Sequence, residues 1–470
     1  MRNLKGRMPR PKIGLLPTGH NYYWSQFPGL KERGLRMYTR LRKKLGTMAD
    51  IVAPELVDTE EKAGQAGELF KRENVDMVVI FPVGYCPSMR MIPAVKDLTV
   101  PIRILNAHED RSYDYASADT TAYLHHEAVC CVPEFAGALV GMGKKFRVRT
   151  GSFDDARLWD ELEADFKGAA AGAFFKKMNI GLIGEIYTHM CDMPLDEHRL
   201  LRATGRLLVR PEVEEIEEAF HRATKDQVKT MLKQFREMYA VDRTVTDKDM
   251  SLSARIAVAF DEIIRKYDIH AFGYYWWGEK ELITTLRSQS ALAVSRLSCM
   301  GRPGVTEGDV KSAMAMKMMD LFGAGGMFAE FSSMDFDENF MMMGHDGPGN
   351  INMAQGHPRL QHLDVHHGKS GRGLGIDFDV KPGPVTLLNL TQFDAGQTFK
   401  IIYTVAEVIP GPILNIGNPN CRVRLNLPIH QFVDAWCRQG PEHHLVIGYG
   451  DQSLALESFA GATGFHIVRI

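Results

Sequence analysis

The feature that most restricts the fold is an alternation of short apolar runs with longer amphipathic stretches. Apolar runs occupy 12–16, 76–81 and 102–105, and a turn-forming or polar segment follows each of them. A segment with helical periodicity spans about 30–45, between the first two runs. Strands that alternate with helices form βαβ units, in which the strands are parallel. We therefore expect the chain to begin with an α/β domain built on a parallel sheet.

The same pattern restarts near residue 178. An apolar run at 179–185 and another at 268–275 have the composition of buried strands, and charged helical stretches lie around them, at 211–239, 251–267 and 279–297. No sequence repeat relates the two regions, which share only this order of elements. A second α/β domain is therefore expected.

The composition of the segments changes after about residue 380. Strand-like runs follow one another with Pro and Gly between them, at 385–390, 399–404, 421–425 and 445–449. Consecutive short strands without helices are typical of a barrel or a sandwich. We predict two α/β domains on parallel sheets, residues 1–174 and 175–325, followed by a β-rich domain, a barrel or a sandwich, at residues 326–470.

Composition excludes several classes of protein. The 470 residues carry a formal net charge of −2, which gives no electrostatic reason to bind nucleic acid. No run of 18 or more residues is apolar throughout, and no apolar segment follows the basic start, so neither a membrane span nor a secretory signal is expected. The seven cysteines are odd in number and form no Cys-x-x-Cys pair, which disfavours a disulfide framework and a structural zinc site. A reducing cytoplasm is the expected compartment.

Carboxylates and histidines accumulate in the last third of the chain. Thr306 is a suitable helix N-cap with Asp309 as its capping-box partner, which predicts Glu307 in the first helical turn, where the helix dipole favours its ionised form. Glu330 ends an apolar, glycine-rich run, and His345 lies in a glycine-rich turn. Two carboxylates with imidazoles suit a divalent cation that takes mixed oxygen and nitrogen ligands. Each residue alone has an ordinary structural explanation, and no motif such as HExxH connects them.

A histidine pair, His443 and His444, begins a strand-like segment that continues through Ile447. Because adjacent strand residues point to opposite faces, we expect at most one of the two to reach such a site, and we favour His444. Polar residues also follow the strands of the first domain, among them His20 and Asn21. Ligands of open α/β sheets bind beyond the carboxyl ends of the strands, which makes these residues candidates for binding.

The L-arabinose isomerase and L-fucose isomerase superfamily has segments that resemble four short segments of this chain. They are Thr306-Glu307-Gly308-Asp309-Val310-Lys311, Met327-Phe328-Ala329-Glu330, Met343-Gly344-His345 and Pro441-Glu442-His443-His444. Gly19-His20-Asn21-Tyr22 also resembles the start of arabinose isomerases. The resemblance implies two Rossmann-like parallel-sheet domains followed by a β-rich, barrel-like C-terminal domain. It also implies an intramolecular oxidoreductase that interconverts an aldose and a ketose through an enediol. It also implies a divalent cation, usually Mn²⁺, with Co²⁺ or Mg²⁺ as alternatives.

Site residues follow from the resemblance position by position. Glu307, Glu330, His345 and His444 are implied as metal ligands, and the two glutamates also as the catalytic acid/base pair. Members of the superfamily form hexamers or smaller rings, such as trimers, in which the first domain of a neighbour closes the site. This arrangement gives a substrate-binding role to His20, Asn21, His126 and Glu127. Trp276, at the end of a predicted strand, could pack on a sugar face, although a place in the core or at a subunit interface is an equal alternative.

Some features depart from the superfamily and keep other functions open. The stretch between Glu330 and His345 is shorter than in arabinose isomerases. The Gly- and His-rich loop at 344–376 is unlike the corresponding region of both arabinose and fucose isomerases. The identity of the sugar is therefore not defined. A non-catalytic sugar-binding or sensor protein is one alternative. A metal-dependent epimerase, or an isomerase of a modified sugar such as a sulfonated one, is another. A nicotinamide-dependent oxidoreductase is disfavoured because no strand is followed by Gly-x-Gly-x-x-Gly.

Overall fold

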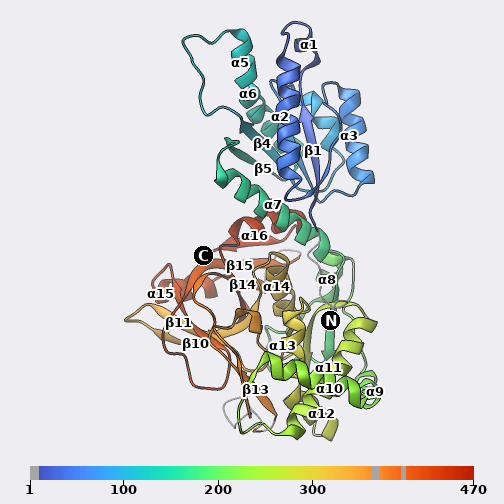
Figure 1. The fold of residues 1–470 in the computed structure, drawn as a ribbon, viewed down its shortest axis with the longest axis vertical. Coiled ribbons are helices and arrows are strands. Elements are labelled where there is room, and N and C mark those ends of the chain that lie inside the picture. Colours follow the sequence, from blue (N-terminus) through green and yellow to red (C-terminus); the bar gives the residue numbers. More distant parts are fainter. Residues whose placement is uncertain (1–9, 363–370, 372, 393–397) are drawn as a thin grey trace. The chain divides into compact units, whose positions relative to one another are not determined.

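The computed structural model describes residues 10–362, 371, 373–392 and 398–470 (Figure 1). These residues form two compact units. The N-terminal unit comprises 10–174 together with 454–463, and the larger unit comprises 175–453 together with 464–470. Within the larger unit, one hydrophobic core contains residues of both the central α/β region and the β-rich region, such as Leu292 and Ile447. The division into three domains stays a prediction.

The N-terminal unit is built on a five-stranded parallel sheet in the order β2-β1-β3-β4-β5. Its strands are β1 (Lys12–Thr18), β2 (Asp50–Val52), β3 (Met77–Pro82), β4 (Ile102–His108) and β5 (Phe146–Ser152). Its helices are α1 (Asn21–Trp24), α2 (Leu30–Leu45), α3 (Glu60–Arg72), α4 (Ile92–Val95), α5 (Thr120–His126), α6 (Ala128–Gly141) and α7 (Ala156–Phe175). This sheet confirms the parallel α/β fold predicted for the start of the chain.

Helices cover both faces of this sheet because its strand side chains alternate between two apolar clusters. Val79 and Phe81 of β3 pack in one cluster with residues of α2 and α7, whereas Val78 and Ile80 pack in the other with residues of α3 and α6. Successive strand residues point to opposite faces, so a strand buried on both sides is apolar at every position. One further helix, α16 (Ser453–Thr463), belongs to this unit although it comes from the end of the chain.

The larger unit contains a second parallel sheet of three strands in the order β6-β8-β9. These strands are β6 (Asn179–Gly184), β8 (Ile269–Tyr275) and β9 (Gly304–Val305). The associated helices are α8 (Glu197–Thr204), α9 (Val213–Arg222), α10 (Lys225–Met238), α11 (Asp247–Lys266), α12 (Glu281–Gln289), α13 (Ala291–Cys299) and α14 (Val310–Leu321). The stretch predicted as helical at 211–239 is divided because Thr224 caps α10 through a capping box with Gln227.

The β-rich region forms a closed six-stranded barrel in the order β14-β17-β10-β11-β16-β15, which pairing of β14 with β15 completes. The strands are β10 (Met327–Asp335), β11 (Phe340–Gly344), β14 (Gly383–Thr391), β15 (Lys400–Ile409), β16 (Asn420–Leu425) and β17 (His444–Tyr449). A further strand, β18 (His466–Arg469), pairs in parallel with β15, and α15 (Ile429–Cys437) lies between β16 and β17 in the chain. The predicted barrel-like fold is thereby confirmed.

Helix α14 connects the two regions of the larger unit. It packs against β8 of the parallel sheet and against β14 and β17 of the barrel. Every residue of α14 except Asp320 is buried, which explains its run of methionines, whose flexible side chains fill irregular space between two layers. A small sheet of β7 (Ala240–Val241), β12 (Arg359–His362) and β13 (Leu374–Asp377) completes the unit.

Several sequence expectations concern the chain as a whole. Helices in the described ranges all lack the combination of length and apolar character that a membrane crossing requires. All seven cysteines are free thiols. Most of the basic N-terminal segment, at 1–9, and two histidines of the 344–376 loop, His366 and His367, lie outside the described residues.

Candidate metal centre

The pairing of the barrel strands brings three of the predicted ligands to one end of the barrel. Glu330 is the fourth residue of β10 and lies opposite His444, the first residue of β17. On its other side, Glu330 lies opposite Gly344, and His345 follows directly where β11 ends. The register of β10 with its two neighbours therefore places these side chains together, although more than one hundred residues separate Glu330 from His444.

Glu307 enters from a tight loop and not from a helix. The prediction that Thr306 caps a helix containing Glu307 is wrong, because α14 begins at Val310 and its N-cap is Asp309, whose carboxylate accepts a hydrogen bond from the Ser312 amide at 3.0 Å. Glu307 and Gly308 both have left-handed backbone angles, with φ of +61° and +73°, which a right-handed helix cannot include. The Glu307 carbonyl accepts a hydrogen bond from the Tyr187 amide, which fixes the loop.

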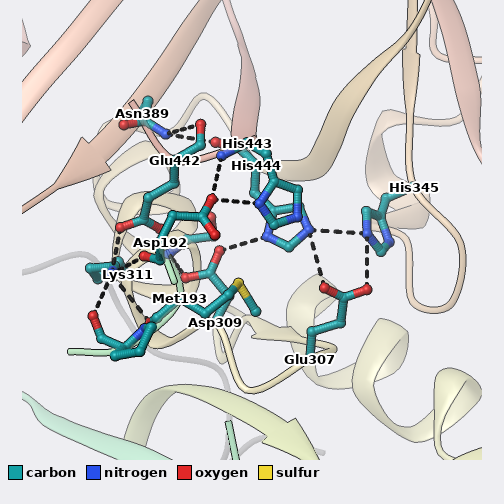
Figure 2. A network of polar contacts seen from close by, with 12 residues as sticks. Asp192, Met193, Glu307, Asp309, Lys311, His345, Asn389, Glu442, His443 and His444 are labelled. Atoms are coloured by element: carbon teal, nitrogen blue, oxygen red, sulfur yellow. Dashed lines mark hydrogen bonds and ion pairs between the residues drawn. The ribbon is translucent and has the colours of Figure 1, made fainter. Parts of the chain in front are cut away.

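The side chains converge closely at this point (Figure 2). Nε2 of His444 lies 3.2 Å from Nε2 of His345, and these two nitrogens lie 3.6 and 3.7 Å from the Glu307 carboxylate oxygens. Ligand atoms of Glu307, His345 and His444 all lie within 4.8 Å of one another, and so do those of Glu330, His443 and His444. Adjacent ligands about 2.2 Å from an octahedral ion are about 3 Å apart, which matches the spacing of the two nitrogens.

The histidines are all oriented through the ring nitrogen that faces away from the cluster. Nδ1 of His444 lies 2.9 Å from the Asp309 carboxylate, and Nδ1 of His443 lies 2.6 Å from the Asp192 carboxylate. Nδ1 of His345 lies 2.8 Å from the Asp346 carbonyl oxygen. Metal-binding histidines are typically held in this way, because the partner at Nδ1 leaves Nε2 free to bind the ion.

Burial and neighbouring charges set the protonation of the cluster. Burial raises the pKa of Glu307, against the opposing effect of His345. Burial alone would lower the pKa of His345, but the hydrogen bond and charge of Asp346, with the charges of Glu307 and Glu330, raise it to about 9. Burial lowers the pKa of His444 to about 4, which outweighs the effect of Asp309. A cation bound here would displace the proton of His345.

One oxygen of Glu307 also indicates that the cluster suits a cation. Oε2 of Glu307 is buried and has no hydrogen-bond partner among the described residues. Buried acceptors without a partner are rare in folded proteins, and a bound cation would satisfy this one. The donor set of carboxylate oxygens and imidazole nitrogens fits a divalent transition metal.

His443 differs from the expectation based on strand alternation. His443 precedes β17, which begins at His444, so the alternation of a strand does not apply to the pair. The rings of His443 and His444 lie 3.8 Å apart, and both belong to the cluster that includes Glu330. Both rings therefore lie beside candidate ligands, and the choice of His444 as the ligand stays a prediction. His444 is the fully buried member of the pair, and His443 is one-third exposed.

The predicted substrate-binding residues His20, Asn21, His126 and Glu127 belong to the N-terminal unit. His20 is the residue before α1, and Asn21 begins it. His126 ends α5 and stacks on Tyr113, while Glu127 accepts a hydrogen bond from the Tyr123 hydroxyl at 2.7 Å. A role of these residues in binding a sugar stays a prediction.

The structure separates the two tryptophans that follow β8. Trp276 is 3% exposed and packs against Phe260 and Tyr274 in the core, whereas Trp277 is 60% exposed and lies beside Tyr187. Only Trp277 of the two offers an open ring face in this structure. A substrate contact by Trp276 stays a prediction.

Sequence reasoning missed Asp192, Lys311 and Glu442, which form a polar network around the histidines (Figure 2). Lys311 gave a signal, because a lysine in a helix as apolar as α14 must find a buried partner. Glu442 directly precedes the histidine pair. Asp192 lies in a loop, and no local pattern marks it.

The fold and the cluster together define a class of protein, in which parallel α/β sheets accompany a closed barrel that carries a candidate divalent-metal centre. A family model described as the L-arabinose isomerase C-terminal domain matches residues 325–466, which include the whole barrel. The L-arabinose isomerase of Halalkalibacterium halodurans is 22% identical over 397 residues, covering 82% of this chain and 79% of that protein. The L-arabinose isomerase of Geobacillus thermodenitrificans is 21% identical over 434 residues, covering 89% and 86%. These similarities support a relationship of this chain to the L-arabinose isomerase family and confirm the resemblance seen in the sequence.

Proposed function

We propose that the protein is a metal-dependent aldose–ketose isomerase that acts on a pentose, a hexose, or a deoxy or modified sugar. The observation that carries this proposal is the convergence of Glu307 and Glu330 with histidines whose Nδ1 atoms are already held by partners. Relatives named L-arabinose isomerase support the isomerase class. Identities of about one residue in five leave the sugar open.

Glu307, Glu330, His345 and His444 are the residues that would hold the cation. Mn²⁺ fits this set better than Zn²⁺, because two carboxylates, two imidazoles and substrate oxygens suit six-coordination. Co²⁺ and Mg²⁺ are the alternatives. When bound, the ion would supply a Lewis acid that polarises the oxygens of the sugar.

Glu307 and Glu330 would move the protons of the reaction. One glutamate takes the proton from C2 of the open-chain aldose while the other, protonated, gives a proton to O1, which yields the enediol. The second glutamate then takes the proton of O2 as the first returns a proton to C1, which yields the ketose. Burial raises the pKa of Glu307, which makes its carboxylate a stronger proton acceptor than that of an exposed glutamate. A positioned acid or base of this kind typically contributes about 10²–10⁴-fold to the rate.

A homo-oligomer in the cytoplasm, either a hexamer or a trimer, completes the proposal. In this assembly His20, Asn21, His126 and Glu127 of one subunit would bind the sugar held at the metal centre of another. No partner other than the sugar and further copies of the chain is required.

The test is deuterium exchange with and without metal. The protein is stripped of metal, Mn²⁺ is restored, and aldoses and ketoses are screened in D₂O for deuterium at C2 of the aldose or C1 of the ketose. We expect Mn²⁺-dependent exchange and ketose formation, both lost in Glu307→Gln and Glu330→Gln. Glu407→Gln is the matched control, because Glu407 is an exposed carboxylate on β15 of the same barrel.

Other outcomes would identify the alternatives. Tight sugar binding without exchange or a metal requirement would contradict the proposal and indicate a sensor. Exchange without ketose formation would indicate an epimerase. Turnover of sulfonated sugars alone would indicate a modified substrate for the same chemistry.

A further inference from the structure

A buried lysine lies beside the candidate metal centre and is not one of its ligands. Lys311, the second residue of α14, is 1% exposed. Its ammonium donates hydrogen bonds to the carbonyl oxygens of Asp192, Met193 and Pro194 at 2.7, 3.2 and 2.8 Å, and pairs with the Glu442 carboxylate at 2.6 Å. A buried ammonium is strongly unfavourable unless several partners compensate it, so these contacts fix the positions of all five groups.

The contacts of Lys311 join two segments that are far apart in the chain. The segment at 192–194 follows β6, and Glu442 directly precedes the histidine pair. The Asp192 carboxylate contacts His443 twice. It accepts a hydrogen bond from the His443 backbone amide at 2.9 Å, and it lies 2.6 Å from Nδ1 of the His443 ring. The side-chain amide of Asn389 donates to the carbonyl oxygens of Glu442 and His444, at 3.2 and 2.6 Å, and so holds the second segment as well.

Figure 2 shows that Lys311 and Glu307 lie on opposite sides of the histidine pair. Asp192 and Glu442 lie between Lys311 and the histidines. The lysine therefore reaches the ligands by two short connections. One runs through Asp192 to His443, and the other runs through Glu442 along the backbone to His443 and His444.

We propose that Lys311 is a positioning residue of the metal centre, which holds the segment at 192–194 and Glu442 so that His443 and His444 stay beside Glu330 and Nε2 of His444 stays beside Glu307. This inference rests on the proposed metal-dependent function. It predicts that loss of Lys311 changes the geometry and the affinity of the metal site in a protein that remains folded.

A second buried lysine on the same helix provides a matched control. Lys317 is 3% exposed, pairs with Asp320 at 2.6 Å and donates to the Gly301 carbonyl oxygen at 2.8 Å. These two partners, Asp320 and Gly301, belong neither to the histidine pair nor to the segment at 192–194. If Lys311 only stabilised the fold, replacing either lysine would have similar consequences.

The experiment uses full-length protein and measures Mn²⁺ affinity from the electron paramagnetic resonance signal of the free ion. The variants are Lys311→Met, the double variant Lys311→Met with Glu442→Gln, and Lys317→Met. We expect Mn²⁺ to bind about 10–100-fold more weakly in both Lys311 variants, because loss of a partner behind the ligands typically has an effect of this size. The visible absorption spectrum of bound Co²⁺, which reports ligand geometry, is expected to change in these variants and to stay unchanged in Lys317→Met.

Wild-type Mn²⁺ affinity and an unchanged Co²⁺ spectrum in Lys311→Met would overturn the inference. Recovery of both in the double variant would also overturn it, because the defect would then come from an unpaired Glu442. If Lys311→Met does not fold, Asp192→Ala tests the same connection at a loop residue. Weaker Mn²⁺ binding is expected there, and unchanged binding would overturn the inference.

The proposed isomerase and the role of Lys311 can fail separately. Lys311-dependent Mn²⁺ binding without turnover of any sugar would contradict the isomerase and leave the positioning role intact. Isomerisation by the wild type with equal activity and affinity in the Lys311 variants would contradict only the positioning role. A wild-type protein that binds no Mn²⁺ would overturn both.

Discussion

Buried charged side chains in this protein are stabilised by oppositely charged or hydrogen-bonding partners. Asp165 of the N-terminal unit is a clear example. Asp165 is fully buried on α7 and accepts hydrogen bonds from Arg103 at 2.7 Å and from Arg149 at 2.8 and 3.0 Å. Burial alone would raise the pKa of Asp165, but the two guanidinium groups lower it below the ordinary value of 3.8. The ionised carboxylate is therefore bound more favourably in the folded unit than in the unfolded chain.

This shift predicts a pH dependence of stability. Because the folded-state pKa of Asp165 lies below the unfolded value, its contribution is fully present above about pH 5 and is lost as the pH falls through 3.8 toward the folded-state pKa. We expect Asp165→Asn to have a smaller change in thermal unfolding midpoint between about pH 5 and pH 3 than the wild type. Circular dichroism over this range measures it, with the exposed Asp154→Asn as control. If the unfolding midpoint of Asp165→Asn changed with pH as much as that of the wild type, the prediction would be contradicted.

At the scale of an element, the loop between β9 and α14 decides where Glu307 points. Gly308 has a left-handed backbone, and a Cβ at this position would lie 2.2 Å from the Glu185 carbonyl oxygen. Glycine is therefore required here twice, for its backbone angles and for the close approach of the segment after β6. This explains why the capping pattern Thr306-x-x-Asp309 does not start a helix at Glu307.

A pair of glycine variants separates the two requirements. Gly323, after α14, has a φ of +79°, but a Cβ at this position would have open space around it. We expect Gly323→Ala to destabilise by about 1–2 kcal/mol, which is the cost of a left-handed alanine. Gly308→Ala should destabilise more and weaken Mn²⁺ binding, because the clash displaces Glu307. Thermal unfolding and Mn²⁺ titration measure these effects, and equal losses of stability in the two variants would show that the close contact does not matter.

At the scale of the whole molecule, the chain returns to its first unit near its end. Helix α16 packs against α7, where a Cβ on Gly168 would lie 2.2 Å from the Ala455 carbonyl oxygen. Ser458 of α16 also accepts a hydrogen bond from Arg103 at 3.1 Å and donates one to the Asp165 carbonyl at 2.7 Å. The N-terminal unit is therefore not a continuous stretch of sequence.

This packing predicts that a single methyl group on α7 destabilises the N-terminal unit. We expect Gly168→Ala to lower the unfolding temperature and to speed proteolysis of α16, because the backbones of the two helices must separate. Gly137→Ala, on α6 with open space around it, is the matched control and should be neutral or stabilising by up to about 1 kcal/mol through helix propensity. Similar effects of the two substitutions would show that the contact with α16 is unimportant.

Local sequence patterns determined the elements and the chemical types at the site. Apolar runs and helical periodicity predicted β1, β3, β8 and α2 within a few residues, because these patterns depend on neighbours in the chain. The residues Glu307, Glu330, His345 and His444 were named from short segments and their resemblance to a superfamily. The structure brings these four residues into two overlapping groups.

Only the tertiary structure decided how these residues meet. The register that places Glu330 between His444 and Gly344 follows from closure of the barrel, a pairing of strands that local periodicity does not encode. Packing of α14 against β14 and β17 brings Lys311 to the segment of the histidine pair, Asp192 reaches His443 from the segment after β6, and the return of α16 completes the N-terminal unit. The physical reason is that a residue's side-chain type and periodicity are local properties, whereas its hydrogen-bond partners depend on the packing of segments hundreds of residues apart.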